Sequence, residues 1–469
     1  MRLFCTDPLF AWDKLPDSPD LIALRFLLDV LPDQRLLLAL RSHRGNGRND
    51  YPVPVLWRVH LARYFLRHEH LEQCLAELGR NPALRRVVGI EEGQKVPEPW
   101  NLSRFQEVLG QEQHLQLMQQ MFQQLTGRLA QAVPDLGQHV AGDSAALSAR
   151  RDGQAPEKDV NPAGLAGGPL PQAAGGKKEY KDDNGKVTQV LEWFGYKFHL
   201  LVDVKHEVVV AWHITSAAGE GTGDSSVLPL LLDKARTVLP EGRIKTLAYD
   251  KAGDDDKTHQ VLHQEGIKPV IQVRCLWKEE LERKLPGHDG NSNVVHDEAG
   301  TIYCYDTVSP VPVKHKMSYL GFEKSRGTLK YGCPCRHEGF KCPSDHKCNG
   351  GSSYGKTVRV KSELDLRRFP PIPRATAEFE RRYNGRTAVE RVNARVKVYW
   401  GADDGNVTGA ERFHAHLATI LLVHAAMANW LASQPRYEGK SLSPTRLSPI
   451  ARKLEKAARR PEMLATVEA

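Results

Sequence analysis

The sequence predicts an α+β protein of several domains, in which a mixed β-sheet with flanking helices follows an all-helical N-terminal region. Up to about residue 135, apolar residues recur at intervals of three and four, which is the period of amphipathic helices. Beyond that point, β-rich runs alternate with helical ones. At 469 residues, the chain is long enough for about three domains of ordinary size.

Composition excludes several classes of protein. Charged residues make up 26% of the chain and hydrophobic residues 41%, near globular averages, so we expect most of it to fold. No uninterrupted apolar run approaches the ~18 residues of a membrane span. Residues 1–13 lack a basic start followed by an apolar block. We therefore expect no membrane span, no secretory signal and a cytoplasmic location.

The positive charge is concentrated in two segments. The chain has 65 Lys and Arg against 57 Asp and Glu, a surplus of +8. Residues 381–397 carry a net charge of +5 and residues 435–461 carry +6, which together exceed the surplus of the whole chain. Concentrated positive charge favours a polyanionic partner, although a solvated basic surface would give the same pattern.

Residues 1–135 are predicted to form the all-helical domain. Helical spacing is clear at Leu21, Leu24, Leu27 and Leu28. Pro52 and Pro54 stand just before a helix expected over Leu56–Leu78, where proline can start a helix but could not sit inside it. Gly79 is the expected stop of that helix.

Residues 136–273 are predicted to form the first part of a mixed sheet. A short strand ends at Asp143, and a stretch rich in Gly, Ala, Pro and Lys at 148–187 is expected to be a flexible loop. The elements expected after it are strands at 191–204 and 207–215, a helix at 225–239, a strand at 244–250, a helix at 255–264 and a strand at 268–273. This order, with acids at two strand ends, resembles the ribonuclease H-like fold.

An insertion is expected at 274–374, before the sheet domain resumes at 375–434 and ends in a basic tail at 435–469. The insertion holds most of the cysteines: Cys304, Cys333, Cys335, Cys342 and Cys348. In a cytosolic protein, such clustering favours metal binding over disulfides. Five thiols, with His337 and His346 as further candidates, exceed the four places of a tetrahedral zinc site. We expect structural zinc, with unliganded thiols as the alternative because a Cys-x2-Cys pair is lacking.

The most informative pattern is Tyr383-x2-Arg386-x3-Glu390-x6-Lys397. On one continuous helix, at about 100° per residue, these four side chains fall within an arc of about 60°. A carboxylate framed by a phenol, a guanidinium and an ammonium group suits a metal-bound phosphate. Charged residues at these spacings are also common on exposed, salt-bridged helices.

The other side of this helix is predicted to be buried. Val389, Val392 and Val396 fall opposite the polar face, where they can pack on the sheet. Asn384 and Gly385 make a poor helix interior, so we expect the helix to begin near Arg386, after Tyr383.

With the rest of the chain, this pattern resembles bacterial insertion-sequence transposases of the DDE type, in the branch marked by a Tyr-Arg-Glu-Lys signature. All four signature positions are matched in residue type and spacing. Residues 51–90 resemble the helical N-terminal domain of these proteins, and residues 194–225 resemble their second and third strands with the turn that follows. The resemblance implies a ribonuclease H-like catalytic domain, Mg²⁺ dependence, and cut-and-paste movement of DNA between terminal inverted repeats.

The resemblance carries three catalytic acids onto Asp143, Asp250 and Glu390. Acids at the ends of neighbouring strands and on a packed helix can also, in their own right, converge on two Mg²⁺ or Mn²⁺ ions. Taken alone, an Asp at a strand end more often caps a turn. In many relatives, Gly-Tyr and another Asp closely follow the second acid. Here the run is Asp250-Lys-Ala-Gly-Asp254 without a Tyr, so Asp254 is a rival for that role.

The resemblance also implies double-stranded DNA as the partner, bound by the N-terminal helices and the basic tail, and a homodimer in the DNA complex. Tyr383, Arg386 and Lys397 would contact phosphate at the site. Sequence-independent phosphate contacts would come from the tail and from four arginines: Arg381, Arg382, Arg391 and Arg395. A bacterial protein of this kind would work at the nucleoid. Two alternatives remain: a domesticated or decayed transposase that binds DNA without cutting it, and a metal-dependent nuclease without strand transfer.

Overall fold

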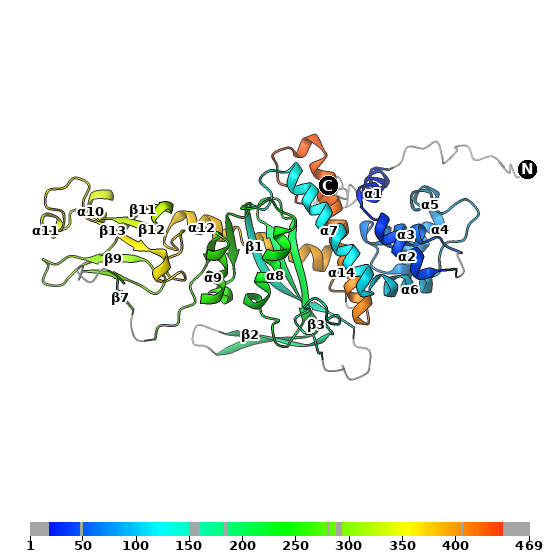
Figure 1. Ribbon diagram of the computed structural model, residues 1–469, viewed down its shortest axis with the longest axis horizontal. Coiled ribbons are helices and arrows are strands. Elements are labelled where there is room, and N and C mark those ends of the chain that lie inside the picture. Colours follow the sequence, from blue (N-terminus) through cyan, green and yellow to red (C-terminus); the bar gives the residue numbers. More distant parts are fainter. Residues whose placement is uncertain are drawn as a thin grey trace, which may run out of the picture.

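The computed structural model describes residues 18–46, 50–150, 159–181, 186–278, 281–287, 293–404 and 407–443. Figure 1 shows three parts in a row: the N-terminal helices, a central sheet with its helices, and a part formed by the chain between β6 and α12. Most of the expected basic tail, residues 444–469, lies outside the described residues.

In the described part of the chain, seven helices precede the first strand, as the apolar spacing predicts for an all-helical region. They are α1 (Pro19–Val30), α2 (Gln34–Arg44), α3 (Val53–Phe65), α4 (Leu71–Arg80), α5 (Pro82–Val88), α6 (Pro99–Leu109) and α7 (Glu112–Ala132). The prediction of a single helix over Leu56–Leu78 is therefore wrong, because this range contains most of α3 and most of α4. Arg67, between them, has a φ of 61°, a left-handed conformation that a right-handed helix interior cannot contain.

The central sheet contains the predicted strands in the predicted order, plus one more. Its elements are β1 (His139–Ser148), β2 (Ala174–Lys181), β3 (Val187–Asp203), β4 (Val209–Ser216), α8 (Asp224–Arg236), β5 (Thr246–Tyr249), α9 (Asp256–Gln264) and β6 (Lys268–Ile271). The sheet runs β4-β3-β1-β5-β6, with β2 pairing with the first half of β3. β3 is antiparallel to β1 and β4, whereas β5 is parallel to β1 and β6.

The expected flexible loop at 148–187 is corrected in its second half, because Ala174–Lys181 forms β2. The partner is the first half of β3, whose β-branched and aromatic residues favour a strand, and whose backbone groups bond with those of β2. At Gly195, β3 passes from β2 to β1 with a φ of 155°, and a Cβ atom there would lie 2.0 Å from the Leu147 carbonyl oxygen. Only glycine fits at this change of partner. Residues 151–158 and 182–185 of the expected loop lie outside the described residues.

The helices and the sheet share one hydrophobic core. The long helix α14 (Ala410–Ala432) joins them, since it packs against α1, α3, α6 and α7 on one side and contacts β4. Among the described helices, α14 is the one with the length and composition of a membrane span, but 83% of its most apolar window is buried inside the protein. Its place is that of a central core helix.

The chain between β6 and α12 forms the predicted insertion. It contains two small sheets, built from β7 (Arg283–Lys284), β8 (Val294–His296), β9 (Ile302–Tyr305) and β10 (Lys314–Lys316), and from β11 (Ser318–Glu323), β12 (Thr328–Gly332) and β13 (Thr357–Lys361). Two short helices, α10 (Pro334–His337) and α11 (Asp345–Asn349), follow β12. A separate core holds the insertion together. The chain then returns to the sheet through α12 (Ala377–Asn384), α13 (Thr387–Ala394) and a π-helical turn (Arg395–Tyr399).

Candidate active site

Asp143 lies on β1, and Asp250 directly follows β5, the strand that pairs in parallel with β1. In the β1–β5 pair, Val140 is opposite Leu247 and Ala141 is opposite Ala248. The same register, continued by two residues, sets Asp143 level with Asp250. The expectation that Asp143 ends its strand is wrong, because β1 continues to Ser148 along β3. Asp143 stands where the parallel pairing stops.

Asp143 sits in a negative environment. Burial raises the pKa of Asp143 to about 6. The charges of Asp224 and Asp250 add to the rise, while the backbone amide of Ser144 and the charge of Arg386 oppose it. The negative charges of Asp143, Asp224 and Asp250 are therefore only partly balanced by positive charge, and a bound cation would stabilise the three carboxylates.

Asp224 is a fourth acid that the sequence reasoning missed. It begins α8, and its Oδ1 lies 3.1 Å from Nδ1 of His199, whose Nε2 lies 3.1 Å from the Thr215 hydroxyl. Burial raises the pKa of Asp224, but the neighbouring His199 and Ser144, with the charge of Lys197, outweigh burial and lower it. His199 is fully buried and lies beside this acid. The signal available in the sequence was an acid in the first turn of the helix after β4.

Arg386 connects the third acid to the first two. Its Nη2 lies 2.8 Å from Oε1 of Glu390 in α13, and the Glu390 side chain is 49% exposed. Burial lowers the pKa of Arg386, but the charge of Glu390, the phenol of Tyr383 and the charges of Asp250 and Asp143 raise it above its usual value. One guanidinium therefore interacts with all three predicted acids.

The segment from Tyr383 to Lys397 does not form one helix. As expected, a new helix begins after Tyr383, because α12 ends at Asn384 and α13 starts at Thr387. Tyr383 lies on α12, where its ring stacks on Phe379 at 5.7 Å. Lys397 lies in the π-helical turn, which changes the direction of later side chains. Its Nζ pairs with Oδ2 of Asp403 at 3.0 Å, and its ion pair is thus with Asp403 and not with Glu390.

The apolar face of this segment is buried, as predicted, but two arginines predicted to contact phosphate pair with a carboxylate of the protein. Val389, Val392 and Val396 are fully buried. Arg395 is also buried, and its Nη2 lies 2.5 Å from Oε2 of Glu207. The Nε of Arg391 lies 2.7 Å from Oε1 of the same carboxylate. The expected phosphate contact of Arg395 is therefore corrected to a buried structural ion pair, and Arg391 shares that partner.

Asp254, the rival for the second acid, is fully buried and saturated with donors. Its carboxylate accepts from Arg367 Nε at 2.9 Å, Arg374 Nη2 at 3.0 Å, His259 Nε2 at 2.9 Å and the Arg274 amide at 2.7 Å. Burial raises the pKa of Asp254, but these hydrogen bonds and charges hold it at about 2. With no lone pair left toward solvent, Asp254 ties the insertion to the sheet, whereas Asp250 is partly exposed after β5.

The cysteines of the insertion lie in a separate place. Cys304, Cys333, Cys342 and Cys348 line one small cavity, and Cys335 does not. Within the ranges that the structure describes, no three His, Cys, Asp or Glu side chains are placed to share one ion.

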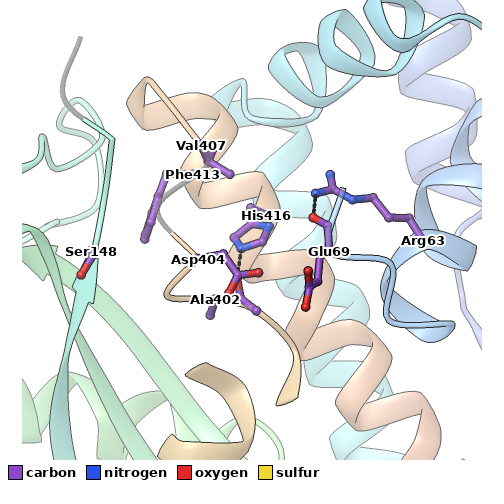
Figure 2. Close-up of a pocket in the computed structure, with 9 residues that line it drawn as sticks. Arg63, Glu69, Ser148, Ala402, Asp404, Val407, Phe413 and His416 are labelled. Atoms are coloured by element: carbon purple, nitrogen blue, oxygen red, sulfur yellow. Dashed lines mark hydrogen bonds between the residues drawn. The ribbon is translucent and has the colours of Figure 1, made fainter. Parts of the chain in front are cut away.

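Another cavity, of about 10 Å³, lies where α3 and α14 meet the loop after the π-helical turn. Figure 2 shows residues that line it, among them Asp404, His416 and, at the end of β1, Ser148. His416 Nε2 lies 3.1 Å from the Gly401 carbonyl oxygen. The lining includes none of the three predicted acids, so this cavity belongs to the domain junction and not to the acidic site.

Two models of transposase domains match this chain. Residues 137–425, more than half of the chain, match the family model of the transposase DDE domain, and residues 12–108 match that of a transposase domain designated DUF772. No curated protein matches the sequence. A solved cryo-EM structure of the piggyBac transposase synaptic complex with hairpin DNA is 13% identical, over 98% of this chain and 76% of that chain, with a TM-score of 0.28. The DDE-domain match spans Asp143, Asp250 and Glu390.

Proposed function

This chain belongs to the transposases with a DDE domain, and from that premise we propose that it cuts DNA at the terminal inverted repeats of an insertion sequence and joins the ends to target DNA. The observation that carries the proposal is the interaction of Arg386 with Glu390, Asp250 and Asp143. The level register of Asp143 and Asp250 supports the same site. These acids with Arg386, Tyr383 and Lys397 make up the proposed Tyr-Arg-Glu-Lys site.

We further propose a ribonuclease H-like catalytic domain. The support is the strand order β4-β3-β1-β5-β6. In this sheet β4, β3 and β1 are antiparallel neighbours, and β5 and β6 run parallel to β1. In this arrangement, Asp143 lies on the central strand β1, and Asp250 follows the neighbouring strand β5. The two acids would therefore lie close together where the parallel pairing of β1 with β5 ends. Helix α13 packs against β1 and β3 and so brings Glu390 to the same edge.

Asp143, Asp250 and Glu390 would hold the divalent cations, Mg²⁺ or Mn²⁺. Carboxylate oxygens are the ligands that Mg²⁺ prefers in proteins. The raised pKa of Asp143 supports a cation site, because a cation favours the ionised form that burial and neighbouring acids oppose. Two bound ions would supply activation of a water or DNA 3′-hydroxyl and charge stabilisation of the leaving oxygen.

The protein's own side chains would bind and orient the DNA phosphate. Arg386 offers a planar guanidinium suited to two nonbridging oxygens, and it neutralises Glu390 until DNA arrives. The Tyr383 hydroxyl would donate a hydrogen bond to the phosphate. Lys397 would need to leave Asp403 to take part. Asp224, kept ionised by His199, would hold negative charge beside Asp143.

Binding of the transposon ends is assigned to the N-terminal helices and the basic tail, in a homodimer that processes both ends, in the cytoplasm at the bacterial nucleoid. The net charge of +6 in residues 435–461 supports phosphate contact by the tail. Arg395 is left out of this surface because it is buried against Glu207.

The test is a cell-based assay in which a marker lies between the inverted repeats that flank this gene. Wild type should excise the marker and insert it elsewhere with a short target duplication, and Glu390→Gln should do neither. Broken donor DNA without new insertions would indicate the nuclease without strand transfer. Binding of the repeats without breaks or insertions would indicate the domesticated, binding-only protein.

A further inference from the structure

Four of the five cysteines in the insertion line one small cavity. The elements β9, β12 and α11, which carry or flank them, lie in the part of the protein that projects away from the central sheet (Figure 1). The cavity has a volume of about 30 Å³. Cys304 comes from β9, Cys333 from the end of β12, Cys342 from the loop after α10, and Cys348 from α11. Four thiols from four separate elements thus face one space.

These thiols interact with one another electrostatically. Burial, with smaller contributions from Cys333, Cys342 and Cys348, raises the pKa of Cys304 to about 12. Burial also raises the pKa of Cys342, with added contributions from Cys333 and Cys348. The four thiols are therefore close enough to influence one another, as their shared cavity also indicates.

We propose that Cys304, Cys333, Cys342 and Cys348 bind one Zn²⁺ ion as a tetrahedral tetrathiolate site. Zn²⁺ in structural sites is almost always four-coordinate, and cysteine thiolates are its preferred sulfur ligands at about 2.3 Å. In the described residues, the four sulfurs line the cavity but do not already surround a common ion position. Zinc binding would therefore draw the sulfurs together in the cavity and displace the four thiol protons into solvent. The site rests on the insertion alone and does not depend on the proposed function.

The remaining candidates for zinc ligands are excluded by their positions. The Sγ of Cys335 lies 3.4 Å from that of Cys333, but it donates to Oδ1 of Asp345 and does not line the cavity. His337 is exposed and lies edge-on to the Tyr354 ring, at 5.3 Å. His346 is exposed on α11 and also does not line the cavity. The four cysteines that line the cavity are therefore the proposed zinc ligands, and Cys335 is not.

A supporting layer of polar groups stands behind the four thiols. Asn349 Nδ2 lies 3.5 Å from Sγ of Cys333 and donates to Oδ1 of Asp345, and Asn349 Oδ1 accepts from the Lys356 amide. Lys356 lines the cavity, and its charge lowers the pKa of Cys304. A tetrathiolate zinc site carries two negative charges, and Lys356 would offset part of them.

The role of this zinc would be structural. It would join β9 of one small sheet to the end of β12 in the other, to the loop after α10 and to α11. The core between the two sheets has nine buried hydrophobic side chains in the described residues, which is little for a unit of this length. Small units with little core commonly depend on a metal or disulfides. Asp254 with Arg367 and Arg374 fixes the inner end of the insertion, and zinc would fix the outer end.

The test is the zinc content of the full-length protein, purified without chelators and measured by elemental mass spectrometry. Wild type should contain one zinc per chain. Cys304→Ser, Cys333→Ser, Cys342→Ser and Cys348→Ser should each lose it. Cys335→Ser is the matched control, since it removes a thiol two residues from Cys333, and it should keep the zinc, as should the exposed Cys275→Ser.

Cobalt replacement in the wild type provides a second readout that requires no variant to fold. Co²⁺ should give the intense visible bands of a tetrahedral thiolate site, lost when zinc is added back. Wild-type protein with neither zinc nor these bands would overturn the proposal. Loss of zinc in Cys335→Ser with retention in Cys304→Ser would overturn the choice of ligands.

Discussion

The Tyr249 ring lies directly against the backbone of Gly142, so that a Cβ atom at Gly142 would come within 2.1 Å of its Cε2 atom. The opposite side of the ring approaches Gly253, where a Cβ atom would lie 2.6 Å from Cδ1. Gly142 precedes Asp143, and Tyr249 precedes Asp250. The contact therefore sets the spacing of the two strands that carry the predicted acids.

Gly142→Ala is expected to disturb this spacing. The ring is 1% exposed and held between two glycines, so it cannot move aside freely, and overpacking of this kind costs about 1–3 kcal/mol. We expect a lower midpoint in urea unfolding and slower DNA cleavage. Gly175→Ala is the control: it places the same methyl group in β2, where no atom lies within 4 Å. Equal effects of the two changes would count against the Tyr249 contact.

The raised pKa of Asp143 predicts how stability depends on pH. The folded protein holds the Asp143 proton up to about pH 6, whereas the unfolded chain releases it near 3.8, so stability falls as pH rises between these values and then levels off. In the metal-free protein at about pH 8, Asp143→Asn should raise the free energy of unfolding by about 1–3 kcal/mol. Thermal melts across this pH range measure the difference.

Mg²⁺ should favour the ionised form of Asp143, whereas burial favours the protonated form. The ion binds the ionised carboxylate, so it should raise the melting temperature of wild type above about pH 6 and lose that effect in Asp143→Asn. An identical Mg²⁺ shift in both proteins would place the ion elsewhere.

Asp254→Asn and Asp250→Asn should fail in different ways. Asp254→Asn leaves Arg367 and Arg374 buried without their carboxylate, which should cost about 3–5 kcal/mol. Asp250→Asn should change stability by about 0.5 kcal/mol or less, yet abolish cleavage. Unfolding in urea and a cleavage assay on both variants make the comparison. Retained cleavage by a folded Asp250→Asn would return Asp254 to the role of second acid.

Arg386→Gln should slow cleavage without unfolding the protein. It removes the guanidinium that interacts with Glu390, Asp250 and Asp143, and loss of such a contact to developing charge costs about 10²–10³-fold in rate. Arg386→Lys keeps the charge but loses the planar fork, so its rate should fall between the two. Arg236→Gln, on the exposed side of α8, should cleave like wild type. Wild-type rates for Arg386→Gln would contradict the role of Arg386.

Patterns that depend on near neighbours were predictable from the sequence. Apolar spacing predicts the burial of Val389, Val392 and Val396, and it also predicts the helical N-terminal region. The order of strands and helices in the sheet was predictable because each element has its own periodicity.

Features that depend on distant residues were not predictable. Arg395 reads as a surface cation until Glu207, 188 residues earlier, is found beside it. Asp254 competes with Asp250 in the sequence because its partners Arg367 and Arg374 follow 113 and 120 residues later. The strand β2 escaped prediction because its Gly- and Lys-rich sequence has low strand propensity and depends on pairing with β3.

The central claim is that Asp143, Asp250 and Glu390 form one metal-dependent cleavage site. The most direct measurement is nicking of the element's terminal repeat by purified wild type and by Glu390→Gln, each with Mg²⁺ and with EDTA. Glutamine keeps the size of the side chain but removes the carboxylate that pairs with Arg386. We predict nicking by the wild type alone, and only with Mg²⁺. Equal nicking by Glu390→Gln, or nicking by the wild type in EDTA, would contradict the account.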